Sequence, residues 1–400
     1  MIGSFKYGWF TLKTTAPTSL LYTKAKTYSS YVNIGASSND ALGRSVSINE
    51  DGTKIAVCSP NANGGRGAIF FYNKFSSTYF VSGALSSMVD VKYYNLVCLD
   101  ETGLSGVASW GVSAPQRLIK FKNSSGTNWT TLGTLTAPIT NLKCDKTSNI
   151  IVYSQPTSAM GGTNRGYARI IEWDGVNAVK AIGNFVGTDD QQLLGIGIAI
   201  SKDGNTIAIA SPYSASTTTK LGCVSTFKWD GTNLIKTYTL WGSQMGQVFG
   251  GRIALNGDGT IMAVASMNEI AANGSRGVVR VYEWVGSNWN QKGNAFYGKS
   301  TTVTSWPNHL DMNSSGNIIA AGYTVDSMGG FTQNGSAQIY QWDGSNWVNV
   351  IPVLSGGSSS DNMGTIDLNA MGNVLVVGVE GYDAGGLTQR GLARVYDLTT

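Results

Sequence analysis

Apolar residues alternate with short polar turns through residues 248–289, and the same pattern recurs along the whole chain. The stretch predicts two β-hairpins in series, the first turning at Asp258-Gly259 and the second at Val285-Gly286-Ser287. An Asp-Gly pair between apolar segments favours a type I′ turn, because that turn needs positive φ angles at its two central residues. The repeating unit is therefore a four-stranded antiparallel sheet, whose strands we call A to D in chain order.

The first hairpin turn of this unit occurs seven times. Its copies are Asp51-Gly52, Thr102-Gly103, Thr147-Ser148, Asp203-Gly204, Asp258-Gly259, Ser315-Gly316 and Met371-Gly372. The period of about 50 residues is that of radially arranged four-stranded blades. Strand B, for example residues 206–211, is apolar almost without alternation, as expected for a strand covered on both faces. We predict an all-β fold, a single seven-bladed β-propeller over residues 35–400.

The seventh copy stops at its strand C, so its strand D has to come from elsewhere. Residues 8–17 resemble the strand D of copy two, residues 128–138, and are the natural replacement. We predict that an N-terminal strand, at about residues 8–16, pairs with strand C of copy seven and closes the ring, since closure removes open strand edges. The rest of residues 1–34 forms a surface arm that either contacts a partner or lies along the ring as a long loop.

The composition indicates a surface of uncharged polar groups. Charged residues are 13% of the chain, hydrophobic residues are 42%, and there are 51 glycines. Such a surface suits an extracellular or virion-exposed protein. The net charge is +4, and the nearest basic cluster, Arg117 with Lys120 and Lys122, is more simply a solvated strand face, so we expect no nucleic-acid partner.

Membrane insertion is not expected, because no apolar run approaches the roughly 18 residues of a spanning helix. Residues 1–10 also lack an apolar core of signal-peptide length. If the chain is complete, it does not use the ordinary secretory route, which is typical of a virus or phage structural protein.

The four cysteines, Cys58, Cys98, Cys144 and Cys223, lie in apolar strand patterns at no metal-like spacing. We expect them to be small buried side chains. Cys98 and Cys144 fall near the first hairpins of successive copies, so a bridge between them stays open, because pairing does not follow from sequence alone.

Several motifs resemble a known repeat family. They are Phe249-Gly250 before strand A, Asn256-Gly257-Asp258-Gly259 at the turn, Ala265-Ser266 or Ser59-Pro60 after strand B, and 279–284 on strand C. Together they resemble FG-GAP-like repeats, the blades of the integrin α-subunit propeller, and look closest to the subset common in marine microbes and their viruses. The resemblance implies the propeller fold for residues 40–400.

Integrin-type blades often carry a calcium loop at the A–B turn, and calcium needs six to eight oxygen ligands. Here the outer positions of that loop are Ala254 and Met262 in copy five. Copies six and seven keep a first carboxylate, Asp311 and Asp367, but lose the central one. We therefore predict no tight metal site and no cofactor.

The candidate chemistry for catalysis is sparse. His309 is the only histidine, and no catalytic partner accompanies it. Asp189, Asp190 and Asp361 lie on D–A links and are more simply loop residues. Arg66, Arg165, Arg276 and Arg390 recur at one blade position, which favours a repeated structural contact. Tryptophans flanking the C–D hairpins, such as Trp342 and Trp347, favour cross-strand packing. We predict that the protein is not an enzyme.

Aromatic residues of the B–C and D–A loops are better binding candidates, since these loops share one propeller face and vary most between copies. They are Trp110, Tyr213, Trp241, Trp306, Tyr323 and Tyr382.

The sequence thus predicts a non-enzymatic virion structural or surface protein: a capsid or tail decoration, a fibre or a host-attachment propeller. Its partners are other virion or surface proteins and a host receptor or glycan, with residues 1–34 serving in part as a docking arm. The alternative is a glycan-binding adhesin, extracellular or on a cell surface. A polysaccharide-active propeller enzyme is the third reading, and it would need an acid–base pair.

Overall fold

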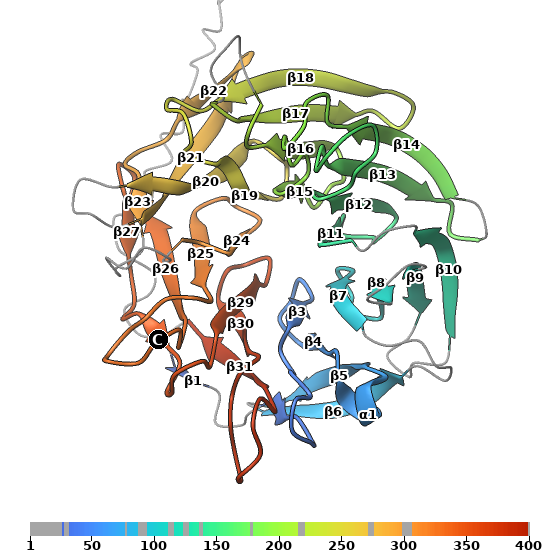
Figure 1. Cartoon of the computed structure of the whole chain (residues 1–400), viewed down its shortest axis with the longest axis vertical. Helices are drawn as coiled ribbons and strands as arrows, with labels where there is room; N and C mark the ends of the chain where they lie inside the picture. Colours follow the sequence, from blue (N-terminus) through green and yellow to red (C-terminus); the bar gives the residue numbers. More distant parts are fainter. Residues whose placement is uncertain are drawn as a thin grey trace, which may run out of the picture.

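Seven antiparallel sheets surround a central axis in the computed structural model (Figure 1). The structure describes residues 26–27, 32–76, 78–86, 94–110, 116–122, 128–135, 139–176, 179–214, 221–270, 276–297 and 306–398. Each innermost strand contacts the innermost strands of the two neighbouring blades, and the last of them contacts the first. The predicted seven-bladed all-β propeller is confirmed.

The strands run from the axis outward in chain order. Blade 1 contains β3 (Ser45–Ile48), β4 (Lys54–Ser59), β5 (Ala68–Phe75) and β6 (Thr78–Ser86), with the short helix α1 (Ala62–Gly65) in its B–C loop. Blade 2 contains β7 (Tyr94–Leu99), β8 (Ser105–Trp110), β9 (Gln116–Lys122) and β10 (Asn128–Leu135). Blade 3 contains β11 (Asn141–Cys144), β12 (Ile150–Gln155), β13 (Tyr167–Trp173) and β14 (Val179–Val186). Blade 4 contains β15 (Ile198–Ile200), β16 (Thr206–Ser211), β17 (Cys223–Trp229) and β18 (Leu234–Trp241).

The outermost positions of the last three blades are each divided between two short strands. Blade 5 contains β19 (Phe249–Leu255), β20 (Ile261–Ile270) and β21 (Arg276–Val285), edged by β22 (Asn288–Gln291) and β23 (Phe296–Tyr297). Blade 6 contains β24 (His309–Met312), β25 (Ile318–Tyr323) and β26 (Ser336–Trp342), edged by β27 (Trp347–Asn349) and β28 (Leu354–Ser355). Blade 7 contains β29 (Met363–Leu368), β30 (Val374–Val379) and β31 (Leu392–Asp397), edged by β1 (Lys26–Thr27) and β2 (Val32–Ile34).

The last blade is closed by the N-terminal part of the chain, as predicted, but by a later segment. Lys26 pairs with Asp397, and Val32 and Ile34 pair with Ala393 and Leu392, so β1 and β2 occupy the outer edge of β31. Residues 8–16, predicted for this place, lie outside the described residues. Residues 26–27 and 32–34, assigned above to the surface arm, are the edge strands instead, because the free hydrogen-bonding groups of β31 are satisfied there.

The space between blades is filled by the strand B side chains. Ile207 and Ile209 of β16 pack toward blade 3, whereas Ala208 and Ala210 pack toward blade 5. Because successive side chains of a strand point to opposite faces, a strand between two blades has to be apolar at every position. The unbroken apolar pattern therefore reports burial on both faces.

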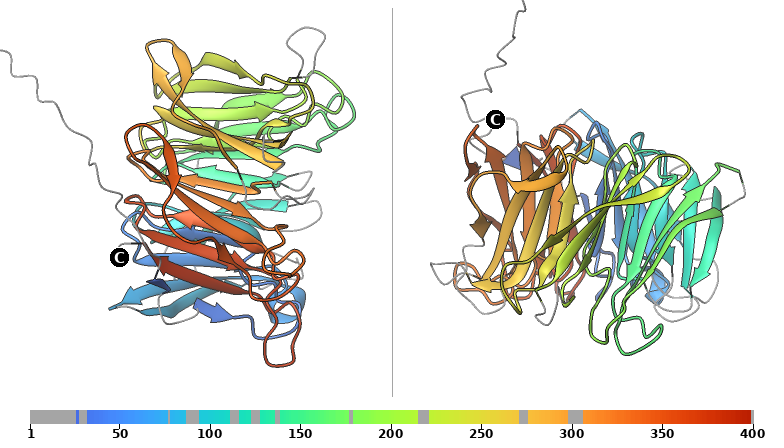
Figure 2. Two further views of the ribbon diagram at one scale, coloured as in Figure 1. Left: turned by 90° about the vertical axis from the view of Figure 1, so that its left-hand side faces the viewer. Right: turned by 90° about the horizontal axis from the view of Figure 1, so that it is seen from above.

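The A–B and C–D turns share one face of the disc, which we call the turn face; the B–C and D–A loops share the opposite loop face (Figure 2). On the turn face, the seven A–B turns are joined by a closed ring of backbone hydrogen bonds. Each bond runs from a backbone N–H group of one turn to a carbonyl oxygen of a neighbouring turn, at 2.6–3.3 Å. The donor–acceptor pairs are Glu50–Glu101, Glu101–Lys146, Lys146–Lys202, Asp203–Gly257, Gly257–Ser314, Ser314–Ala370 and Ala370–Glu50. Every blade is thus bonded to the next, including blade 7 to blade 1.

The A–B hairpins are confirmed, but their turn type is not I′. Gly259 has a φ of 68°, while Asp258 does not have a positive φ, and Gly259 N–H donates to Asn256 O. The turn is therefore of type I followed by one left-handed glycine. The Asn256 Oδ1 atom accepts from the N–H groups of Thr260 and Ile261 (both 2.9 Å), which fixes the turn.

Copy three lacks the glycine, and a buried lysine stabilises its turn. Ser148 takes the left-handed conformation with a φ of 52°. Lys120 Nζ donates to the carbonyl oxygens of Thr147 (3.1 Å) and Ser148 (2.6 Å), to Ser148 Oγ (2.6 Å) and to Asn149 Oδ1 (3.2 Å). Lys120 is 2% exposed, so the predicted solvated face is wrong at this residue: β9 is covered here by blade 3. Lys122 stays exposed.

Candidate functional site

The predicted aromatic residues fall into three groups. Trp241 ends β18 and is 38% exposed, and Tyr213, Trp306 and Tyr382 are half-buried. Tyr323 is 0% exposed. Trp110 ends β8, and its side chain lies outside the described part of the structure.

Tyr323 is a core residue and cannot stack on a ligand at the loop face. It is the last residue of β25 and packs among Ala265, Phe296 and Tyr340, between blades 5 and 6. Burial raises the pKa of its hydroxyl well above the ordinary value. The apolar pattern of strand B extends one residue further than predicted, which places the ring inside.

Tyr382 and Trp306 have mainly structural surroundings. Tyr382 packs against the core of blades 6 and 7, and its carbonyl oxygen accepts from Gly391 N–H at 3.1 Å. The backbone of Trp306 crosses directly over Gly277, where a Cβ atom would lie 2.8 Å from Trp306 Cα. Gly277 has a φ of 75°, so this close approach and this conformation both require glycine.

Exposed apolar side chains gather on the loop face at blades 4 and 5. Trp241 is followed in the D–A loop by Met245, which is 73% exposed, and Ile270 at the end of β20 is 58% exposed. The two segments lie side by side, because Asn268 N–H donates to Gln247 O at 3.0 Å. Tyr213 occupies the B–C loop of the same blade 4. We call these four residues, Tyr213, Trp241, Met245 and Ile270, the blade 4–5 patch.

The central channel, about 620 Å³ in volume, is lined by the innermost strands of all seven blades. Its ionisable groups are Arg44, Lys143, Lys202, Arg252, His309, Asp311, Asp367 and Glu380. At the loop-face end, Arg44 donates to both carboxylate oxygens of Glu380 (3.0 and 2.8 Å), which joins blade 1 to blade 7. Arg252 of blade 5 donates to the carbonyl oxygens of Asn308 in blade 6 and Ile196 in blade 4.

In blades 1, 6 and 7, a recurring contact joins the inner strand to that of the following blade, and it is made by the second residue before the asparagine that caps the A–B turn. Asp311 Oδ2 accepts from Leu368 N–H, and Asp367 Oδ2 accepts from Ile48 N–H, both at 2.7 Å. Ser47 Oγ accepts from Leu99 N–H at 3.0 Å. Burial, together with the nearby Asp311 carboxylate, raises the pKa of Asp367. These acids therefore bond blade to blade, a role that no single copy of the repeat indicates.

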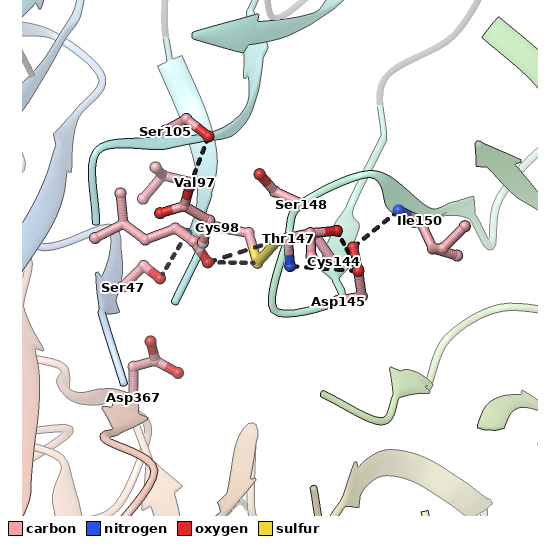
Figure 3. The surroundings of a disulfide bond; sticks show 12 residues. Ser47, Val97, Cys98, Ser105, Cys144, Asp145, Thr147, Ser148, Ile150 and Asp367 are labelled. Carbon is pink, nitrogen blue, oxygen red and sulfur yellow. Dashed lines mark hydrogen bonds between the residues drawn. A yellow bond between two sulfur atoms is a disulfide. The ribbon is translucent and has the colours of Figure 1, made fainter. Parts of the chain in front are cut away.

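Between blades 2 and 3, the same position carries a disulfide bond. Cys98 of β7 and Cys144 of β11 are joined, with a Cα–Cα distance of 6.3 Å (Figure 3). The pairing left open by the sequence is thus present, and Cys58 and Cys223 are buried thiols, as predicted.

His309 is the first residue of β24 and lines the channel near the axis. Burial, with Arg252 as the largest charge effect, lowers its pKa to about 3. A general base functions best when its pKa lies near the working pH.

Two of the recurring arginines, Arg165 and Arg390, make structural contacts, and so do hairpin tryptophans. Arg165 Nε bonds to Asp190 Oδ1 (2.8 Å), and Arg390 Nε donates to Gly35 O (2.6 Å), so both join a B–C loop to the next D–A loop. Cations from the preceding blade cover the tryptophan rings, with Lys180 over Trp229 as one example at 5.2 Å. Further cases are Lys122 over Trp173 and Lys292 over Trp342.

The D–A carboxylates shape their own loops. Asp361 is buried and its Oδ2 accepts from Gly357 and Ser358 N–H at 2.8 and 3.0 Å. Within the described ranges, no three His, Cys, Asp or Glu side chains gather as metal ligands. Within those same ranges, no helix has the length and apolarity needed to cross a membrane.

Sequence reasoning missed Met245 and Ile270, which carry most of the exposed area of the patch. Neither side chain is aromatic, and the sequence pattern singles out aromatic rings as binding candidates. The signal was present in the sequence, because Met245 interrupts the polar run Ser243-Gln244 in a predicted loop.

Comparison with known proteins supports the fold and not a family. No model of a known protein family matches the chain, and no curated protein matches it. Among solved structures, the chain is similar to the β-propeller domain of Cps50 (Swd1) from Myceliophteria thermophila, with a TM-score of 0.61 at 11% sequence identity over 92% of this chain and 99% of that one. The likeness at this identity shows a seven-bladed propeller, and the FG-GAP-like resemblance rests on the sequence motifs alone.

Proposed function

We propose that the protein is a non-enzymatic virion structural or surface protein of the FG-GAP-like type, which presents the loop face of its propeller to a binding partner. The blade 4–5 patch is the observation that carries the proposal. Exposed apolar residues on neighbouring loops are typical of interaction sites, and tryptophan and tyrosine are enriched among residues that dominate binding energy. The partner is a virion or surface protein, or a host receptor or glycan.

The channel chemistry supports a scaffold better than a catalyst. Four of its ionisable groups, Arg44, Arg252, Asp311 and Asp367, hold contacts between blades. A catalytic carboxylate pair needs one acid free to donate a proton and one free to attack or activate water. Here each of the two aspartates has an oxygen committed to a backbone N–H group.

The two faces of the disc are suited to two roles. Strand β31 runs from the loop face to the turn face, and Lys26 pairs with its last residue, Asp397. Lys26 therefore lies at the turn face, opposite the blade 4–5 patch. A docking role for residues 1–34 would place the turn face against the particle and leave the loop face outward.

The alternative, a glycan-binding cell-surface adhesin, is favoured by the exposed ring of Trp241 beside uncharged polar neighbours. Ser243 and Gln244 follow it in the loop and carry no charge. Aromatic faces stack on apolar faces of sugars, and amide and hydroxyl groups bond to sugar hydroxyls. A glycan array distinguishes this reading from protein recognition, and a reducing-sugar release assay tests for catalysis.

Immunogold labelling of purified particles tests the location; particles that stay bare would contradict a virion role. For the patch, we expect Trp241→Ser with Met245→Ser to abolish binding of the purified propeller to the target surface. Ile235→Ser is the matched control, because Ile235 lies at the turn-face end of the same strand, β18, and is 54% exposed. Equal binding by both variants would contradict a role of the blade 4–5 patch in binding.

A further inference from the structure

The inner strands of blades 1, 6 and 7 share one side-chain contact with the following blade, and blade 2 carries a disulfide bond at the same position. Ser47, Asp311 and Asp367 occupy equivalent positions, and each accepts a backbone N–H from the following blade. Cys98 stands at this position in blade 2. Its partner Cys144 stands where the following blades carry Leu99, Leu368 and Ile48.

We propose that the Cys98–Cys144 bond is a redox-dependent clasp: it replaces the polar contact between blades 2 and 3, and a small thiol that enters the central channel opens it. The inference does not depend on the proposed function. A thiol is a weak hydrogen-bonding group. Reduction therefore leaves the interface of blades 2 and 3 without the side-chain contact that the interface of blades 1 and 2 has at this position.

The bond is accessible from the channel. Both cysteines line it, and Cys98 is half-buried. The channel volume of about 620 Å³ falls in the range of small-molecule sites. Cys58 and Cys223 are buried elsewhere in the blades, and burial raises the pKa of both thiols. They are therefore poor competitors in thiol–disulfide exchange, which requires the thiolate.

The exchange balances in both directions. A thiolate of the small reductant attacks one sulfur, the S–S bond breaks, and the other cysteine leaves as a thiolate. A second small thiol then displaces the first from the mixed disulfide, giving two protein thiols and one small-molecule disulfide. In the reverse direction, the two thiols lose two protons and two electrons, and a small-molecule disulfide is reduced to two thiols.

Reduction should loosen the interface and not unfold the protein. Lys146 O still accepts from Glu101 N–H at 2.6 Å, and Lys120 still holds Ser148. The bond links residues 46 positions apart. The loop-entropy relation gives the stability that a disulfide across a loop of this length contributes. Dividing that free energy by the unfolding entropy of a 400-residue chain gives a fall in Tm of about 5 °C on reduction.

The test compares the full-length protein with and without tris(2-carboxyethyl)phosphine or dithiothreitol. We expect two titratable thiols in the denatured oxidised protein and four after reduction, a Tm lower by about 5 °C on reduction, and recovery with oxidised glutathione. Four thiols without reduction, or an unchanged Tm on reduction, would overturn the proposal.

Paired variants separate the lost covalent bond from the lost polar contact. Cys98→Ser/Cys144→Ala should be insensitive to reductant yet more stable than Cys98→Ala/Cys144→Ala, because the introduced serine hydroxyl would accept from the N–H of residue 144 as Ser47 does from Leu99. Cys58→Ser should keep the full response to reductant. A response that persists in the Cys98 variants would also overturn the proposal.

Discussion

Replacing Lys120 with methionine should destabilise the propeller far more than the same change at Lys122, two residues along the same strand. Lys120 Nζ has four oxygen acceptors around Ser148 and lies 4.9 Å from the Trp173 ring. Methionine fills a similar volume but leaves those oxygens without a donor. Removing one partner of a buried charged contact lowers the free energy of unfolding by about 3–5 kcal/mol.

Lys122 is a matched control because it covers the same ring at 5.0 Å but is exposed. An exposed cation–π contact contributes about 0.5–1 kcal/mol. For a chain of 400 residues, an unfolding entropy of about 2.1 cal/mol/K per residue converts these costs to about 4–6 °C for Lys120→Met and about 1 °C for Lys122→Met. Calorimetry measures both. Equal shifts in the two variants would refute the anchoring of the Ser148 turn by Lys120.

The pH dependence gives an independent check on the burial of Lys120. Burial lowers its pKa to about 8 from an ordinary value of 10.5, although the Asp145 and Asp100 carboxylates act in the opposite direction. Between these pH values the unfolded chain binds more protons than the folded one, so stability rises with pH. The stability difference between the parent and Lys120→Met should therefore grow from pH 8 to 10.5, and a constant difference would contradict the lowered pKa.

Three further changes test the ring. The pKa of Asp367 is raised above its ordinary value of 3.8, so the folded protein binds more protons than the unfolded chain above that pH, and the parent loses stability as pH rises. Asp367→Asn removes this titration, so the fall in Tm between pH 5 and pH 8 should be smaller in the variant than in the parent. An equal pH profile of Tm in parent and variant would count against it. Gly259→Ala should lower the free energy of unfolding by several kcal/mol, since the new Cβ would lie 2.2 Å from Thr206 Oγ1. Gly286→Ala is the control: Gly286 has a similar φ of 66° and open space around it, so the loss should be only about 1–2 kcal/mol of backbone strain. Urea unfolding measures both. Deleting residues 1–34 should expose the β31 edge, lower Tm and promote aggregation more than deleting residues 1–18; equal behaviour in light scattering would argue against closure by β1 and β2.

The blade count could be predicted from the sequence because each copy contains its own local signals. The Asp-Gly pairs mark the turns, and an unbroken apolar strand such as 206–211 marks burial on both faces. Both signals act within a few residues, so tertiary context rarely overrides them. The turn type was wrong because Asn256 caps the turn through its side chain, and that bond selects a type I geometry.

The inter-blade contacts could not be predicted, because they join residues that are distant in sequence and are specified by no single copy. Lys120 was assigned to a solvated face since strand C alternation does not show which face the next blade covers. Asp311 and Asp367 were considered only as ion ligands, although their place in the hairpin directs them to the next inner strand. The closing strand was placed at 8–16 on local resemblance, whereas residues 26–27 and 32–34 pair with the edge of β31.

The candidate site was predicted in part. Tyr213 and Trp241 lie in the blade 4–5 patch, while Tyr323 is buried, and the exposed Met245 and Ile270 were overlooked. The cause is that side-chain exposure depends on how loops of neighbouring blades lie against each other. Residue type alone indicates which rings can bind and not which ones are exposed.

Site-specific labelling of intact particles tests most directly the proposal that the propeller is displayed with its loop face outward. Met245→Cys places a thiol on the loop face at a residue that is 73% exposed, and Val285→Cys places one on the turn face at a residue that is 53% exposed. Cys58 and Cys223 are buried and provide a low background. With a membrane-impermeant maleimide, we predict labelling of the Met245→Cys particles and protection of the Val285→Cys particles. Protection of Met245→Cys with labelling of Val285→Cys, or labelling of neither on intact particles, would contradict the account.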